Sequence, residues 1–222
     1  MCSTSQRGSR SAKATRSSRR RLGAERFEFR ICCPRVAEAS APANVVDTSA
    51  FAPLPEIVAP RLKALFVGIN PGFASARAGH HFANPANGFW RLLHEAGFTP
   101  RQYAPAEDRL LLALGLGITN LVARTSAGSA DLTREELLAG AETLGRTIER
   151  WRPRAVVFVG ITVRAAFARR FELERPASHG ECGGFAGARL FVVPNPSGRN
   201  AHFSYAQMRT RYRAVARALR LR

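Results

Sequence analysis

The sequence predicts an α/β protein: a three-layer α/β/α domain with a central, mainly parallel four-stranded sheet. Two observations lead to this prediction. Short, largely apolar runs, typical of strands buried on both faces, recur at residues 64–69, 117–122, 155–160 and 189–193. Segments with helical periodicity separate these runs, and strands that alternate with helices form parallel sheets covered on both sides.

Local sequence features define the helices. We expect helices over residues 86–96, 105–114, 134–151, 161–171 and 205–219. Gly97 ends the first helix, and Pro153 prevents extension of the third. Thr133 with Glu136, and Ser204 with Gln207, form capping boxes before the third and last helices. The helix over 161–171 is expected to carry its arginines on its outer face.

The charge of the chain favours a polyanionic partner. The 222 residues include 34 Lys and Arg against 16 Asp and Glu, a formal charge of +18, which favours nucleic acid over a membrane surface. Residues 1–24 hold seven basic residues, no acid and almost nothing apolar, so we expect residues 1–50 to form a basic, disordered N-terminal tail. Beyond residues 1–24, 27 basic residues stand against 16 acidic ones, or +11.

Several classes of protein are excluded. No apolar run approaches the roughly 18 residues of a membrane helix, so we expect a soluble protein with no membrane partner. The cysteines at positions 2, 32, 33 and 182 fit neither a zinc site nor a disulfide framework. We therefore expect no metal and no cofactor. We also expect a monomer that is cytoplasmic and associated with DNA. An organelle-targeting role of the tail, or translation from an upstream start codon, stays open.

Two of the expected strands end in polar loops. These loops are residues 68–72 and 194–198, and each contains Pro and Gly. In open parallel sheets, ligands bind outside the carboxyl ends of the strands, where loops and helix N-termini meet. The first loop continues to residue 90 with more polar and aromatic side chains than a simple connection needs. A binding site is therefore predicted at this edge, and residues 51–222 form its domain.

The motifs on these loops match a known family. They are Gly-Ile-Asn-Pro-Gly at 68–72, Gly-His-His-Phe at 79–82, Pro-Ala-Asn-Gly-Phe-Trp at 85–90, Gly-Ile-Thr-Asn-Leu-Val at 117–122 and Asn-Pro-Ser-Gly at 195–198. Together they closely resemble the mismatch-specific uracil/thymine DNA glycosylases of the uracil-DNA glycosylase superfamily. The resemblance extends from about Leu54 to the C-terminus. It implies an enzyme that flips a mispaired uracil out of double-stranded DNA, hydrolyses its glycosidic bond and leaves an abasic site.

The resemblance also implies roles for individual residues. Asn70 holds the attacking water, because its amide can donate and accept hydrogen bonds without ionising. Phe82 stacks on the flipped base, Ser75 faces the C5 edge of the pyrimidine, and Asn120 reaches base-edge groups. The base pocket as a whole comprises Gly68, Ile69, Ser75, His81, Phe82 and Asn120. The pair His80-His81 lacks a carboxylate or Cys at ligand spacing, which argues against a metal site.

The second loop is expected to enter the DNA. The matched residues are Asn195, Ser197, Gly198, Arg199 and Asn200. Small residues let backbone N–H groups approach phosphate and the widowed guanine, and Arg199 fills the gap left by the flipped base. Common bacterial members carry an aliphatic wedge here, whereas residues 199–203 resemble the thymine-type enzymes. The base range among uracil, thymine and related lesions therefore stays open.

Two rival functions are compatible with parts of the sequence. One is a non-catalytic, basic nucleic-acid-binding α/β protein, against which the presence of Asn70 argues. The other is a small-molecule nucleotide-binding domain. The first strand is followed by neither a Gly-x-Gly-x-x-Gly motif nor a Gly-Lys-Ser/Thr phosphate loop, which argues against this second class.

Overall fold

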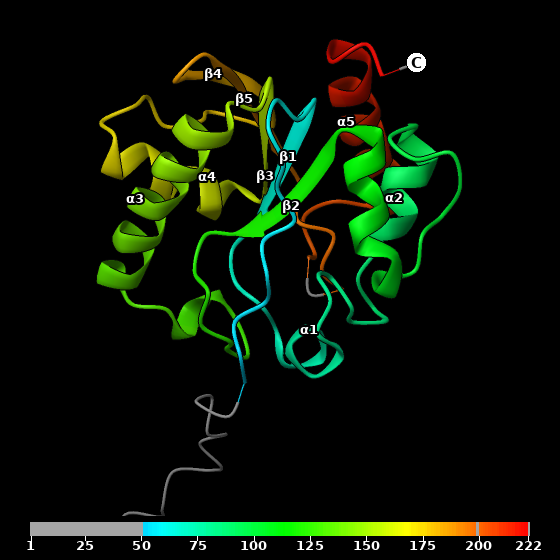
Figure 1. The fold of residues 1–222 in the computed structure, drawn as a ribbon, viewed down its shortest axis with the longest axis horizontal. Coiled ribbons are helices and arrows are strands. Elements are labelled where there is room, and N and C mark those ends of the chain that lie inside the picture. The colour runs from blue at the N-terminus through cyan, green and yellow to red at the C-terminus, as the bar shows by residue number, and fades with distance from the viewer. Residues whose placement is uncertain (1–50, 199, 222) are drawn as a thin grey trace, which may run out of the picture. The chain divides into compact units, whose positions relative to one another are not determined.

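A central sheet organises the part of the chain that the computed structural model describes, residues 51–198 and 200–221. The strand order is β2-β1-β3-β5-β4 (Figure 1). The strands are β1 (Ala64–Gly68), β2 (Leu116–Asn120), β3 (Ala155–Val159), β4 (Gly180–Phe185) and β5 (Ala188–Val193). The predicted tail, residues 1–50, lies outside the described residues. No helix within the described ranges is both long and apolar enough to cross a membrane.

The four predicted strands form the parallel part of the sheet. Strand β1 pairs with β2 on one side and β3 on the other, so that Phe66 lies opposite both Ile118 and Val157. Strand β3 pairs in parallel with β5. Every residue of β1 and β3 is buried, because helices cover both faces of the sheet. The predicted α/β/α class is confirmed.

A fifth strand, β4, corrects the predicted strand number of four. It runs antiparallel to β5 at the sheet edge, with a register shift between Glu181 and Gly184. Its sequence, Gly-Glu-Cys-Gly-Gly-Phe, has only partly buried and exposed residues. An edge strand needs neither a continuous apolar run nor strong strand propensity, so pattern reading misses it.

The helices follow the predicted alternation. They are α1 (Phe73–Ala78), α2 (Phe89–Ala96), η2 (Pro105–Leu114), η3 (Ser129–Asp131), α3 (Arg134–Trp151), α4 (Ile161–Arg170) and α5 (Tyr205–Ala218). Both capping boxes are present, with Thr133 accepting from the Glu136 N–H and Ser204 from the Gln207 N–H. Residues 105–114 form a 3₁₀ helix, and the short α1 lies inside what the sequence indicated as a loop.

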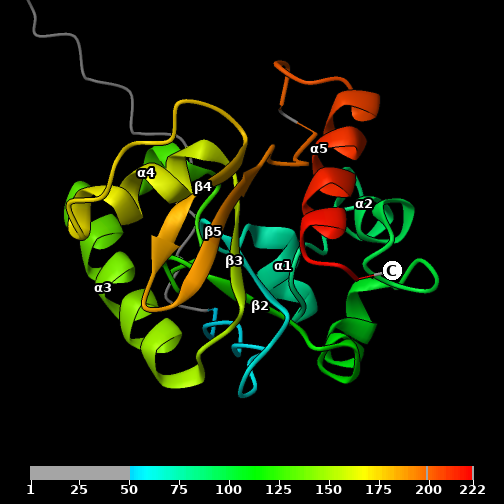
Figure 2. The same cartoon turned by 90° about the horizontal axis from the view of Figure 1, so that it is seen from above.

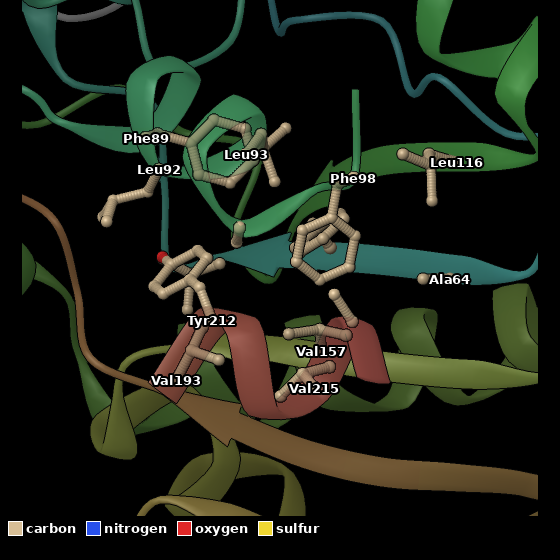
Figure 3. Packing of buried hydrophobic residues seen from close by; sticks show 14 of the residues in the cluster. Ala64, Phe89, Leu92, Leu93, Phe98, Leu116, Val157, Val193, Tyr212 and Val215 are labelled. Atoms are coloured by element: carbon tan, nitrogen blue, oxygen red, sulfur yellow. The ribbon is translucent and has the colours of Figure 1, made fainter. Parts of the chain in front are cut away.

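Alternate strand residues feed two separate cores. Figure 2 shows the sheet between α3 and α4 on one side and α2 and α5 on the other. Phe66 and Val157 face α2 and α5, whose Phe89 and Tyr212 fill the core drawn in Figure 3. The intervening residues of the same strands pack against α3 and α4. This division follows from the two-residue period of a strand, which sends successive side chains to opposite faces.

Arg164 departs from the expectation that the arginines of the fourth helix face solvent. Its side chain is buried, although Arg169 and Arg170 are exposed as expected. The guanidinium donates through Nη2 to the carbonyls of Glu174 and Cys182, at 3.1 and 3.3 Å. The cation thus ties α4 to the segment that leads into β4 and to β4 itself, a role that helical periodicity cannot indicate.

The contact between α3 and the chain after β2 gives a test of the packing. A Cβ on Gly140 would lie 2.1 Å from the carbonyl oxygen of Leu121. Gly140→Ala should therefore lower the free energy of unfolding by about 1–3 kcal/mol, because backbone must move, although Ala is the better helix former by about 1 kcal/mol. Urea denaturation measures the change.

The neighbouring exposed position provides the matched control for this substitution. Ala139→Gly in the same helix should cost about 1 kcal/mol through helix propensity alone. A Gly140→Ala variant more stable than the parent would show that α3 does not rest on the Leu121 backbone.

Candidate functional site

A cavity of about 910 Å³ opens at the carboxyl ends of the parallel strands. Residues that end or follow β1, β2, β3 and β5 line it, including Gly68, Asn120, Gly160 and Asn195. Helix α1 lies at this end of the sheet and contributes Ser75 to the lining (Figure 1). The cavity thus lies where the sequence placed a site, and its walls come from segments far apart in the chain.

Asn70, just beyond β1, is held by the loop that follows β2. Its amide Nδ2 donates to Ser126 Oγ at 2.8 Å and to the Arg124 carbonyl at 3.2 Å, with a third contact to its neighbour Pro71. All the side-chain hydrogen bonds between Asn70 and the described residues use Nδ2. The amide is therefore fixed with its acceptor, Oδ1, at the other end.

The loop that holds Asn70 is itself clamped to α3. Arg124 donates through Nε and Nη2 to the Glu136 carboxylate at 2.5 and 2.9 Å. The Arg124 guanidinium, with the Thr133 N–H, lowers the pKa of Glu136 to about 2. Glu136 is also the capping-box residue of α3. The start of this helix thus fixes the carbonyl that accepts from Asn70.

The segment around Phe82 is held in a rarely adopted backbone conformation. Phe82 has φ of 53°, in the left-handed region that non-glycine residues seldom occupy. Hydrogen bonds hold the residues on either side: Ser75 Oγ accepts from the Ala83 N–H at 3.0 Å, and Trp90 Nε1 donates to the His81 carbonyl at 3.2 Å. The Phe82 ring lines the cavity and stacks on Phe89 with centroids 3.9 Å apart.

His81 is buried, and its ring joins two segments. Its Nε2 lies 3.0 Å from the Pro55 carbonyl, and its Nδ1 lies 3.4 Å from Asn120 Nδ2. Burial lowers the pKa of His81 from its ordinary value of 6.5, and the Pro55 carbonyl and the carboxylates of Asp108 and Glu56 oppose this shift. The lowered pKa favours the neutral ring.

Close approach at the end of β1 explains Gly68. A Cβ at this position would lie 2.6 Å from Asn120 Oδ1 and 3.2 Å from Phe82 Cζ. Any side chain here would displace the Asn120 amide or the Phe82 ring. Gly68 therefore allows these two groups to lie side by side at the cavity wall.

The second loop contributes Asn195, Ser197 and Gly198 to the lining of the same cavity. Asn195 Oδ1 accepts from the Ser197 N–H at 3.1 Å, and Asn200 Nδ2 donates to the Asn195 carbonyl at 2.8 Å. A Cβ on Gly198 would lie 3.1 Å from that of Ala86. These contacts fix the loop on both sides of Arg199, which lies outside the described residues.

The predicted site residues within the described part come together at one cavity. Its lining includes Gly68, Ile69, Asn70, Ser75, His81, Phe82, Asn120, Asn195, Ser197, Gly198 and Asn200. Sequence reasoning missed Leu54, Ser126 and His179, whereas the lining residues His202 and Phe203 belong to the run 199–203 that resembles the thymine-type enzymes. The polar run Thr-Ser-Ala-Gly-Ser at 125–129 could have indicated Ser126. Nothing in the pattern around Leu54 or His179 distinguishes either residue from an ordinary loop residue.

The cavity lining is nearly free of charge. Among its described residues there is no Asp, Glu, Lys or Arg, and its titratable side chains are His81, His179 and His202. His80 points to Asp108 instead, with Nδ1 3.1 Å from the carboxylate. No group of three or more His, Cys, Asp or Glu suited to a metal ion occurs in the described ranges. Amide groups, hydroxyls and an aromatic face suit a flat, uncharged ligand with hydrogen-bonding edges.

Comparisons with known proteins bear on the family and the fold. Residues 55–220 match the model of the Uracil DNA glycosylase superfamily. A solution NMR structure of a candidate uracil DNA glycosylase from Methanosarcina acetivorans is similar in fold, with a TM-score of 0.53 and 20% sequence identity. The match covers 76% of this chain and 98% of the other.

The lowered pKa of His81 predicts how stability depends on pH. In the unfolded chain His81 binds a proton as the pH falls through about 6.5, whereas the folded chain resists protonation. The stabilising effect of the neutral ring is therefore complete above this pH and declines between it and the lower folded-state pKa. Urea denaturation at a series of pH values measures this decline.

A variant isolates the contribution of His81. His81→Gln should flatten the decline, because the amide does not titrate, while burial of His179 leaves a smaller slope. An identical slope in the parent and the variant would show that His81 is not the group responsible.

Proposed function

The chain belongs to the uracil DNA glycosylase superfamily, and from this premise we propose that it excises uracil mispaired with guanine from double-stranded DNA. Family membership supports hydrolysis of the N-glycosidic bond in DNA. The finer proposal is that a monomer flips the mispaired nucleotide, holds the attacking water on Asn70 and leaves an abasic site. Thymine and related damaged pyrimidines are further candidate bases.

One observation carries the mechanism: a fixed amide, Asn70, borders a cavity lined by no ionised carboxylate. The described lining residues therefore include no carboxylate that could act as a general base. Because Ser126 and Arg124 hold Nδ2, Oδ1 is the end that can accept a hydrogen bond from water. We infer that Asn70 acts by positioning the water against the sugar carbon, an effect that lowers the barrier without proton abstraction by a charged group.

The rest of the chemistry depends on the leaving base. Uracil can depart as an anion, and developing charge on its oxygens is stabilised by N–H donors that need no reorganisation. Backbone N–H groups around Ile69 and Phe82 are the candidates. The departing base leaves an oxocarbenium-like sugar, whose positive charge the DNA phosphates stabilise. No strong acid is required at the base, and the proton that the water loses when it adds to the sugar passes to the uracil anion or to solvent.

Recognition of the base follows from the cavity wall. One face of Phe82 is covered by Phe89, so its other face can stack on a flipped pyrimidine. Asn120 Oδ1 lies beside that ring and can accept the N3–H of uracil or thymine. Ser75 is committed to the Ala83 N–H, and its small size near the C5 edge would bear on tolerance of a methyl group.

The proposed preference for mismatches does not require the protein to recognise the base while it is still stacked in the duplex. Flipping costs about a few kcal/mol, and the cost is least for a mispaired base. The second loop supports this step, because Ser197 and Gly198 are small and line the rim. Arg199 follows them directly and is proposed to occupy the gap in the stack.

The test is excision from a panel of oligonucleotides containing G·U, G·T, A·U and single-stranded uracil. Alkali-labile cleavage should appear in the G·U duplex. Asn70→Ala should abolish nearly all excision but keep mismatch binding within about tenfold, or roughly 1.4 kcal/mol, because positioning acts mainly in the transition state. Ser126→Ala, which removes the shortest of the hydrogen bonds that hold the Asn70 amide, should lower the rate about 5- to 10-fold.

Two results would contradict the proposal. DNA binding without any excision by the parent protein would favour the non-catalytic nucleic-acid-binding class. Excision by Asn70→Ala at the parent rate would leave glycosylase activity in place but remove Asn70 from the mechanism.

A second prediction concerns Arg199. If its side chain keeps the flipped base from returning, Arg199→Ala should lower excision from a G·U duplex more than excision of uracil from a single strand, where no stacked gap exists. Single-turnover rates on both substrates measure the ratio. Equal losses on the two substrates, or no loss, would show that Arg199 is not a wedge.

A further inference from the structure

His81 connects the segment before β1 to the base-facing amide at the end of β2. The Pro55 carbonyl can only accept a hydrogen bond, so the contact with His81 Nε2 at 3.0 Å requires a proton on Nε2. In a neutral ring, Nδ1 is then an acceptor. Asn120 Nδ2, 3.4 Å away, is a donor and completes the pairing.

These two hydrogen bonds of His81 together determine which end of the Asn120 amide faces the cavity. With Nδ2 directed to His81, Oδ1 takes the position above Gly68, beside the Phe82 ring. If Nδ1 carried a proton, it would meet the N–H groups of Nδ2, and the amide would have to rotate by half a turn. The cavity would then present a donor where the base carries its own N3–H.

The segment that supplies the Pro55 carbonyl is itself fixed. Ile57 exchanges backbone hydrogen bonds of 2.9 and 3.0 Å with Ile118 of β2. Glu56 accepts from Thr119 Oγ1 at 2.6 Å. These contacts place the carbonyl on one side of the His81 ring, with Asn120, from the end of the same strand β2, on the other.

We propose that His81, held as the Nε2–H tautomer by the Pro55 carbonyl, is a positioning residue that keeps the acceptor end of Asn120 toward the base. It thereby selects pyrimidines with an N3–H, the uracil and thymine class, over cytosine, whose N3 is an acceptor. This inference rests on the proposed function. Protonation of His81 rotates the amide and abolishes the selection, so base excision falls at acid pH.

The charged groups around His81 set where this loss occurs. Asp108, from η2, accepts a hydrogen bond from the backbone N–H of His81 at 3.4 Å, and its carboxylate also contacts His80 Nδ1. Glu56 approaches from the segment before β1, and both carboxylates favour protonation of the ring. Burial and His80 act in the opposite direction. The ring therefore stays neutral at pH 7 and becomes charged only in more acid solution.

The first test reads the tautomer without any activity. In the ¹⁵N-labelled full-length protein, the imidazole ¹⁵N shifts and long-range couplings of His81 should show a protonated Nε2 and an unprotonated Nδ1 at pH 7. The opposite tautomer, or a charged ring at pH 7, overturns the proposal. This outcome is independent of whether the protein cuts DNA.

The second test separates positioning from a structural role. The single-turnover rate on a G·U duplex should fall in the parent as His81 becomes protonated, by about tenfold for loss of the N3–H hydrogen bond and its replacement by a facing donor. His81→Asn supplies an amide oxygen that does not titrate, so the acid loss should disappear while the neutral-pH rate stays within about tenfold of the parent. His81→Phe should be slow at every pH.

The neighbouring histidine provides the control. His80 does not line the cavity, so His80→Asn should retain the acid loss of the parent. An acid loss that persists in His81→Asn, or that vanishes in His80→Asn, overturns the proposal. If the parent excises no uracil at any pH, the proposed function fails, and the tautomer measurement still decides whether His81 fixes the Asn120 amide.

Discussion

Two-sided burial of the central strands is the constraint on which the rest of the structure depends. Every residue of β1 and β3 is buried, so polar side chains that meet a ligand lie at the strand ends or beyond them. Because β1, β2, β3 and β5 are parallel, those ends converge on one edge. The chemistry of this protein is therefore concentrated in loops whose positions are set by a rigid sheet.

The loops gain rigidity from hydrogen bonds that run between segments distant in sequence. Asn70 depends on Ser126 and the Arg124 carbonyl, and Arg124 depends on Glu136 at the start of α3. The strained backbone of Phe82 depends in the same way on its neighbours. Such strain persists only where surrounding contacts over-determine the conformation, and it is concentrated at functional sites.

The uncharged cavity fits the reaction proposed for it. A carboxylate beside a departing uracil anion would repel it, whereas amides and backbone N–H groups stabilise it and also read its edge. The Asn120 amide oxygen and the Phe82 ring meet above Gly68, and the His81 ring contacts the other end of the same amide. In the proposed reaction, base selection depends on hydrogen-bond direction, so that one proton on one imidazole nitrogen would decide which base is accepted.

The sequence by itself determined the parallel α/β class, because continuous apolar runs such as 64–69 have few alternatives to buried strands, and it determined the helix starts at Thr133 and Ser204 through their capping boxes. It also identified the residues on the two loops that line the cavity. Only the tertiary structure decided the fifth strand, whose exposed glycines carry no apolar pattern, and the burial of Arg164, whose partners are backbone carbonyls. The tertiary structure also decided the hydrogen bonds from Asn70 to Ser126 and from His81 to the Pro55 carbonyl. These residues lie 56 and 26 positions apart, so their contact depends on how the chain packs, which local sequence does not encode.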